Sequence, residues 1–319
     1  MSTQPTALEL QRETQSLGAV CDAVAAAWLG DRHLVELLVT GVVAGGHILI
    51  EDVPGVGKTT LAKALATAFG LSFNRVQFTS DTLPADVLGG SVYHPARGEF
   101  DFVPGPIFTD FLLADEINRA PTRSQSAFLQ AMEEGQVAVD GLNHPLPPSF
   151  TVVATQNPID FESTHPLPEA QLDRFLIATP LGYPDDDSEC ALLANGAGVV
   201  SATVRPVLAA AQLPALREAA AAVWLHPDLA AYIVALARAT RSDERLRLGI
   251  SPRGALHLAQ AARAHALVTG ADGVRPEHLH RLLEPVWAHR LLPRHGRDPE
   301  RAIGHEVLRD VRERVQLPR

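Results

Sequence analysis

The chain has 319 residues, 46% of them hydrophobic, and its 27 basic and 37 acidic residues give a formal net charge of −10. This size and apolar content suit two domains better than one. The acidic balance, without any block rich in lysine or arginine, disfavours binding of nucleic acid as the main activity. Cys21 and Cys190 are too few for a disulfide framework, and no apolar run is long enough to predict a membrane span. We expect a cytoplasmic protein.

The N-terminal part alternates between helical and strand-like patterns. Apolar spacing predicts helices over residues 8–30 and 32–46, and HILIE at 47–51 predicts a short buried strand before a glycine-rich turn and a helix over 60–69. Further strands are predicted at 74–78, 110–115 and 150–156, with a helix at 123–135. Strands that alternate with helices indicate an α/β fold with a parallel sheet between layers of helices.

The composition changes after residue 187, where the chain becomes rich in alanine and leucine. Helices are predicted at 207–222, 227–241, 252–269 and 276–291, without a strand. We therefore expect an α/β domain at residues 1–184, with the N-terminal helices included, a linker at 183–187, and an all-helical domain at 187–319. The histidines show no metal-binding spacing, and we interpret them as ordinary surface residues.

The turn EDVPGVGKTT, residues 51–60, has the composition of a phosphate-binding loop. Its glycines would let backbone amides converge on phosphate oxygens at the start of a helix. Lys58 would neutralise the phosphates, and the Thr59 hydroxyl would hold Mg²⁺. The pattern G-x-x-x-x-G-K-[ST] is broken at its first glycine, so a turn without function is the alternative. The candidate nucleotide-binding residues are Asp52, Val53, Pro54, Gly55, Val56, Gly57, Lys58, Thr59 and Thr60.

Two other predicted strands end in polar residues. FLLADEIN places Asp115 and Glu116 after a buried strand, at the edge where doubly wound sheets bind ligands. Asp115 would hold Mg²⁺ and Glu116 would polarise an attacking water; without a P-loop upstream, a solvated turn would be the better interpretation. VVATQNP places Asn157 at the same edge, where its amide would orient the water, with an Asn-Pro turn as the alternative.

These motifs resemble the MoxR family of AAA+ ATPases over roughly residues 33–292. The similar segments are HILIEDVPGVGKTTLAKALA, DVLGGSVYHPARGEFDFVPGPIFTDFLLADEINRAP, SQSAFLQAMEEGQV, VVATQNPID, PLPEAQLDRF and SPRGALHLAQAARAHALVTG. The resemblance implies a P-loop AAA+ core with a parallel sheet flanked by helices, a C-terminal helical lid, and hydrolysis of ATP with Mg²⁺. Loops of this family often carry an acidic residue or glycine at the position of Asp52. The mismatch to the strict pattern is therefore only a weak argument against a phosphate-binding loop.

The resemblance also implies two catalytic arginines. LPEAQLDRF is similar to the segment with the arginine finger, which places Arg174 on a neighbouring subunit's nucleotide; from the sequence alone, an arginine capping a helix is favoured. SPRGA is similar to sensor 2 and implies a role for Arg253, after Ser251 as helix cap. A cation at a helix N-terminus opposes the dipole, and a phosphate nearby would relieve that cost.

The implied partners are proteins. SVYHPARGEFDFVPGP resembles the helix 2 insert, a hairpin directed to the pore of a ring, where Tyr93, Phe100 and Phe102 would contact clients or else pack within the hairpin. VAVDGLNHPLPPSF resembles the hairpin before sensor 1. The family implies a ring, a hexamer, that remodels or matures partner complexes with a separate von Willebrand A-domain protein.

Three alternatives remain open from the sequence. One is a magnesium-chelatase-like motor subunit, which would share the core and its motifs. A nucleic-acid motor is disfavoured, because residues 91–103 hold Arg97 as their single fixed cation against Glu99 and Asp101. A regulatory switch that does not hydrolyse ATP is disfavoured by the intact Asp115 and Glu116.

Overall fold

The core of the molecule is a five-stranded sheet in the order β2-β5-β8-β1-β9. The computed structural model describes residues 7–28, 30–53, 55–157, 165–183, 204–294 and 301–317, with isolated positions between 186 and 193. All neighbouring strands of this sheet run parallel, as predicted. The strands are β1 (His47–Glu51), β2 (Phe73–Gln77), β5 (Phe111–Asp115), β8 (Thr151–Gln156) and β9 (Phe175–Thr179). The edge strand β9 was missing from the prediction.

Helices cover both faces of the sheet. Successive residues of a strand point to opposite faces, and in β1 Ile48 and Ile50 pack with α1, α2 and α3, whereas Leu49 packs with α5. These helices are α1 (Ala7–Ala27), α2 (Arg32–Val43), α3 (Lys58–Ala68), α4 (Pro84–Leu88) and α5 (Thr122–Glu134). The 3-10 turn η1 (Ile117–Arg119) comes after β5, and the short α6 (Glu169–Leu172) precedes β9.

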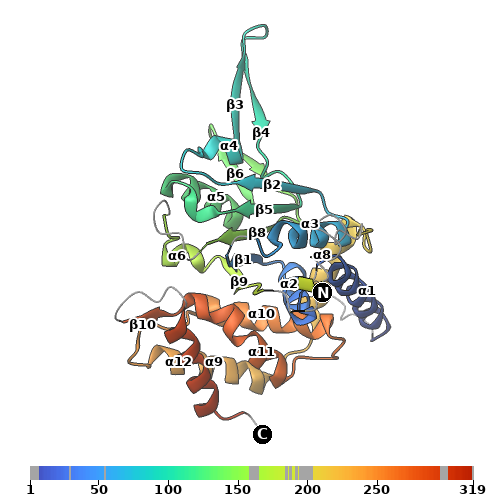
Figure 1. Ribbon diagram of the computed structural model, residues 1–319, viewed down its shortest axis with the longest axis vertical. Helices are drawn as coiled ribbons and strands as arrows, with labels where there is room; N and C mark the ends of the chain where they lie inside the picture. Colours follow the sequence, from blue (N-terminus) through green and yellow to red (C-terminus); the bar gives the residue numbers. More distant parts are fainter. Residues whose placement is uncertain are drawn as a thin grey trace.

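Two antiparallel hairpins extend from the core, where the family resemblance places them. Strands β3 (Gly89–His94) and β4 (Glu99–Pro104) form the long hairpin at the top of Figure 1. The second hairpin consists of β6 (Gln136–Val139) and β7 (Leu142–Pro145). The ring of Phe102 stacks on His144 of this second hairpin with centroids 3.8 Å apart. The two hairpins therefore support each other at the base of the longer one.

The C-terminal part is helical. Its helices are η2 (Ala210–Gln212), α8 (Leu213–Ala222), α9 (Pro227–Arg241), α10 (Pro252–Val268), α11 (Pro276–Trp287), η3 (Ala288–Arg290) and α12 (Ala302–Arg314). The helices α9–α12 lie below the sheet in Figure 1, whereas α8 lies beside α2. The prediction missed α12 and a small antiparallel pair, β10 (Leu246–Leu248) with β11 (Leu292–Pro293). The predicted domain ends at 184 and 187 lie outside the described residues. No helix among the described residues is long and apolar enough to cross a membrane.

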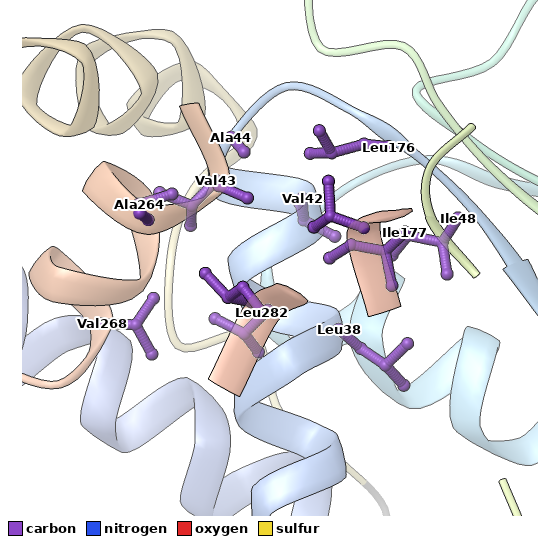
Figure 2. Packing of buried hydrophobic residues seen from close by; sticks show 14 of the residues in the cluster. Leu38, Val42, Val43, Ala44, Ile48, Leu176, Ile177, Ala264, Val268 and Leu282 are labelled. Atoms are coloured by element: carbon purple, nitrogen blue, oxygen red, sulfur yellow. The ribbon is translucent and has the colours of Figure 1, made fainter. Parts of the chain in front are cut away.

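Helix α2 joins the sheet to the helical part. Its buried residues pack on one side against β1 and β9 and on the other against α10 and α11, within one hydrophobic cluster (Figure 2). A Cβ added at Gly41 would lie 2.8 Å from Ile48 Cδ1, so glycine allows α2 to lie directly on β1. The labelled residues of this joint are Leu38, Val42, Val43, Ala44, Ile48, Leu176, Ile177, Ala264, Val268 and Leu282. The apolar core is thus continuous between the two predicted domains.

Three histidines correct the expectation of surface positions, and one of them, His289, is 3% exposed in η3. His265 of α10 and His278 of α11 are 2% and 9% exposed, and their rings meet edge to face at 5.5 Å. The hydroxyl of Thr40 in α2 lies 3.1 Å from His265 Nδ1. Burial lowers the pKa of His265 to about 4. The ring is therefore neutral near pH 7 and belongs to the packing between α2 and the helical part.

Candidate nucleotide-binding site

The predicted phosphate loop connects the carboxyl end of β1 to the first turn of α3. Gly57 is the N-cap of α3 with φ 83°, and Gly55 has φ 98°, both in the region that favours glycine. A Cβ at Gly57 would lie 3.0 Å from Trp28 Nε1, whereas a Cβ built at Gly55 has no described atom beyond its chain neighbours within 4 Å. The loop is therefore packed from below and open at Gly55. Pro54 lies outside the described residues.

Trp28, which no motif indicated, supports this loop from beneath. It lies just after α1, is 5% exposed, and its Nε1 donates a hydrogen bond to the Val56 carbonyl at 3.5 Å. The Val56 side chain is itself 7% exposed. Val56 thus anchors the loop by its side chain, and α1 takes part in fixing the conformation of the backbone.

Lys58 opens α3 and lies among the predicted acidic residues. Its Nζ donates to the Asp52 carbonyl. Burial lowers the pKa of Lys58, while the nearby carboxylates of Asp52, Asp115 and Glu116 oppose that shift. The structure therefore brings Lys58 and the strand-end carboxylates to one place. Thr59, also in this first turn, is partly buried, and the adjacent Thr60 is exposed.

The carboxylate of Asp52 serves the loop itself. Its Oδ1 accepts from the Val53 N–H at 2.7 Å, and its Oδ2 accepts from the N–H groups of Leu181 and Gly182, both at 2.8 Å. Asp52 is 9% exposed, and these bonds tie the beginning of the loop to the segment after β9. An acidic residue at the position of the missing glycine therefore has a structural reason.

Asp115 ends β5, Glu116 follows it, and the two residues share a hydrogen-bonding partner in β8. The Thr155 hydroxyl donates to Asp115 Oδ1 at 2.6 Å and accepts from the Glu116 N–H at 2.9 Å. Glu116 adopts a left-handed conformation with φ 56°, which is uncommon for this residue type. The side chains of Asp115 and Glu116 therefore point in different directions. The Thr155 hydroxyl binds the carboxylate of the first and the backbone N–H of the second.

Strand β2 supplies two polar partners that sequence reasoning did not identify. Arg75 Nη2 donates to Asp115 Oδ2 at 2.7 Å and to Gln77 Oε1 at 2.8 Å. Gln77 Nε2 in turn donates to Glu116 Oε2 at 2.8 Å, and Arg119 Nε lies 3.1 Å from the same oxygen. Arg75 and Gln77 lie on either side of the apolar Val76 in β2, and this spacing of two is the signal in the sequence that could have indicated them.

Asn157 lies after β8 at the same edge of the sheet, as predicted. Its carbonyl accepts a hydrogen bond from Asn118 Nδ2 at 3.1 Å, and Asn118 is 6% exposed. Nearby, Glu51 at the end of β1 is bound by Gln156 Nε2 and by Arg301 Nη2. Since Arg301 precedes α12, the helical part reaches the edge of the sheet that carries the loop.

The two predicted arginines lie at the opposite edge of the sheet. Arg174 immediately precedes β9, whose first residue Phe175 pairs with His47 at the start of β1. The loop begins at the other end of the five-residue β1, so it lies about 16 Å from Arg174 along the strand direction. Arg174 Nε lies 2.8 Å from Glu133 Oε2, and Arg253 Nη1 lies 2.7 Å from Glu133 Oε1. The four predicted catalytic residues therefore form two groups: Glu116 with Asn157, and Arg174 with Arg253.

The carboxyl edge fits a nucleotide with a divalent cation. It offers an open glycine loop, a lysine, helix N-terminal amides and a hydroxyl, which are phosphate-binding groups. Among the described residues, no group of three or more His, Cys, Asp or Glu forms a protein cage for a metal ion. Mg²⁺ does not require one, because it usually takes one or two protein ligands together with phosphates and water. A hydroxyl and a carboxylate, such as those of Thr59 and Asp115, match that donor set.

Comparisons with known proteins agree with this geometry. The family model of the ATPase family associated with various cellular activities (AAA) matches residues 47–177, and that of the AAA lid domain matches 238–311. The uncharacterized protein YeaC of Bacillus subtilis is 40% identical over 303 residues, covering 95% of each chain. Chaperone MoxR1 of Mycobacterium tuberculosis is 40% identical over 299 residues, 91% of this chain and 79% of that protein. A crystal structure from Cytophaga hutchinsonii, provisionally assigned as an ATPase, has a TM-score of 0.87, 32% identity and 97% coverage of both chains.

The fold, the loop and the lid define a P-loop AAA+ ATPase, an enzyme that hydrolyses ATP. Within that class, the chain belongs to the MoxR family. AAA+ proteins bind nucleotides and generally form ring oligomers.

Replacing Asp52 with alanine should weaken both the fold and nucleotide binding. The backbone N–H groups of Val53, Leu181 and Gly182 would lose their acceptor, at a cost of about 0.5–1.5 kcal/mol for each hydrogen bond. Urea unfolding should show this loss, and titration with a fluorescent ATP analogue should show weaker binding. Asp272→Ala, at a side chain that is 92% exposed, is the matched control. Equal stability and affinity in the two variants would contradict this role of Asp52.

Proposed function

We propose that the chain uses ATP hydrolysis with Mg²⁺ to remodel or mature partner protein complexes, as a chaperone-like MoxR ATPase. The observation that carries the proposal is the group of Lys58, Asp115 and Glu116 beside an open glycine loop at one edge of the sheet. The α/β domain, residues 1–184, would bind the nucleotide, and the helical lid, residues 187–319, would move in response. The chaperone and MoxR relatives favour this function over that of a magnesium-chelatase-like motor subunit.

The residues at the carboxyl edge would divide the chemistry between them. Loop amides and Lys58 would bind the phosphates, while Thr59 and Asp115 would hold Mg²⁺, which neutralises phosphate charge. Glu116 would polarise the attacking water, and its hydrogen bond from Gln77 would fix the direction of the carboxylate. Asn157 would position that water or the terminal phosphate.

The variants Glu116→Gln and Lys58→Ala should separate hydrolysis from binding. Glu116→Gln removes a general base but keeps the shape of the side chain, so ATP should still bind while turnover falls by roughly 10²-fold or more. Lys58→Ala removes the cation that binds phosphate, so affinity should fall instead. Isothermal titration with ATP and steady-state phosphate release measure the two effects. Unchanged turnover in Glu116→Gln would refute the proposed base.

The two arginines would act on the nucleotide of a neighbouring subunit. They lie about one strand length from the loop of their own chain, at the opposite edge of the sheet. A ring in which the amino edge of one subunit faces the carboxyl edge of the next would bring Arg174 and Arg253 to a bound phosphate. We propose a hexamer, with the sensor 2 arginine acting in trans like the finger.

Mixing two inactive variants should restore hydrolysis if the finger acts in trans. Subunits with Glu116→Gln keep their arginines, and subunits with Arg174→Ala keep their catalytic carboxylate. Each variant alone should be nearly inactive, because loss of an arginine finger costs on the order of 10³-fold or more. In the mixture, the interfaces that join the intact Arg174 of one subunit to the intact Glu116 of the next should release phosphate. A mixture no more active than its components would argue against action in trans.

The β3–β4 hairpin is the proposed client contact. Its Tyr93 and Phe100 lie opposite each other in register, with ring centroids 5.1 Å apart, and are 51% and 70% exposed. Phe102 is held by His144 and Phe108 and is better suited to support the hairpin. The cation Arg97 is paired with Asp101, which argues against a grip on nucleic acid. We propose a protein client and a separate von Willebrand A-domain partner in the cytoplasm.

The hairpin should retain partners through its aromatic face. Glu116→Gln protein with bound ATP, used as bait in lysate, should recover an A-domain protein or its client. Tyr93→Ala with Phe100→Ala should abolish this recovery, because the exposed aromatic pair supplies the contact area. Val92→Ala, 48% exposed on the other face of the hairpin, is the matched control. Salt-sensitive retention of DNA with stimulation of ATPase activity would contradict the proposal.

A further inference from the structure

We propose that Glu133 is a positioning residue that holds Arg174 and Arg253 together, so that a subunit presents both arginines to its neighbour's nucleotide as one unit. The inference rests on the proposed function, in which both arginines act in trans. Glu133 lies near the end of α5 and has no role assigned by the sequence motifs. It binds one arginine from the core and one from the lid.

The geometry of this link uses both carboxylate oxygens. Oε2 is 2.8 Å from Arg174 Nε, and Oε1 is 2.7 Å from Arg253 Nη1. The hydrogen bond from Arg253, followed by the charges of both arginines, lowers the pKa of Glu133. Glu133 is therefore ionised at neutral pH and lies between two cations that would otherwise repel each other. Asp173 Oδ2, 3.8 Å from Arg253 Nε, adds a weaker second contact to Arg253, while Asp173 Oδ1 contacts Arg290.

Such a pairing leaves the arginines able to bind phosphate. A guanidinium has five N–H donors in a rigid fork, so an arginine held by a carboxylate through one nitrogen can bind a phosphate oxygen through others. The side chains of Arg174 and Arg253 are 22% and 45% exposed, and that of Glu133 is 34% exposed. The two arginines are thus at the surface, and Glu133 fixes their orientation.

The lid also holds the backbone around the finger. Arg290 Nη1 lies 3.3 Å from Asp173 Oδ1, and Arg290 Nη2 donates to the Phe175 carbonyl. His289 Nε2 lies 3.0 Å from the same carbonyl. The Arg290 side chain is 3% exposed, so this contact is buried between lid and sheet. Residues on both sides of Arg174 are therefore fixed to η3, and the position of the lid determines where the finger lies.

The test uses the mixture of Glu116→Gln and Arg174→Ala subunits and adds Glu133→Gln to only one of these two kinds of subunit. In that mixture the Glu116→Gln subunit donates the arginines and the Arg174→Ala subunit hydrolyses ATP. With Glu133→Gln on the donor, kcat should fall roughly tenfold or more, because displacement of a catalytic group by about 1 Å can cost up to ~10²-fold. KM for ATP should stay unchanged. With Glu133→Gln on the hydrolysing subunit, kcat should stay at the level of the parent mixture.

Glu134→Gln on the donor is the matched control. Glu134 is the adjacent exposed carboxylate, and it accepts a hydrogen bond from Gln130 in its own helix. It should leave kcat unchanged, whereas a loss equal to that of Glu133→Gln would point to general damage to α5.

Three results would overturn the proposal. The first is an equal fall in kcat with Glu133→Gln on either subunit, and the second is an unchanged kcat with Glu133→Gln on the donor. The third is a rise in kcat with Glu133→Gln on the donor, which would mean that Glu133 restrains the arginines. A parent mixture without hydrolysis would instead contradict the finger in trans and, with it, this inference. The failure of the positioning role is thus distinguishable from the failure of the proposed function.

Discussion

The parallel pairing of β1 with β9 is the constraint on which the rest of the site depends. Because the strands run in the same direction, the segment after β1 and the segment before β9 lie at opposite edges of the sheet. The phosphate loop comes after β1, and Arg174 precedes β9. An antiparallel edge strand would have brought the arginine beside the loop of its own chain. The fold instead places the loop and Arg174 at opposite edges of the sheet. This separation is the basis for our proposal that each subunit carries two half-sites and is active in a ring.

The lid contacts both of these edges. At the carboxyl edge, Arg301 binds Glu51 at the end of β1, next to the phosphate loop. At the amino edge, Arg290 binds Asp173, the residue before Arg174. Helix α2 lies between them with its apolar residues packed on the sheet and on α10 and α11. The lid therefore contacts the sheet both beside the phosphate loop and beside Arg174.

Much of the carboxyl edge could be predicted from the sequence, because its signals are local. The loop with Lys58 lies between a short apolar strand and a helix, and Asp115 and Glu116 come directly after such a strand. The predicted fold class was also confirmed, because the alternation of apolar strands and helices is a local pattern as well. Strand β9 was missed, because a five-residue apolar run without a motif does not distinguish a strand from the interior of a helix.

The remaining features depend on contacts between distant parts of the chain. The bonds of Arg75 and Gln77 to Asp115 and Glu116 exist only because β2 lies beside β5. Asp52 was predicted as part of the loop, but its bonds to the segment after β9 required the fold. His265 and His278 resemble surface residues in sequence and are buried because α2, α10 and α11 meet around them. The roles of Arg174 and Arg253 came from resemblance, and their shared partner Glu133 from the structure.

The central claim is that a single subunit does not contain a complete catalytic site. The most direct measurement is ATPase activity per subunit over a wide range of protein concentrations, with the molecular mass determined at each concentration by light scattering. The account predicts that activity rises in step with the population of the ring and that monomers are nearly inactive, since they lack an arginine at the loop. A monomer with full activity per subunit would contradict it.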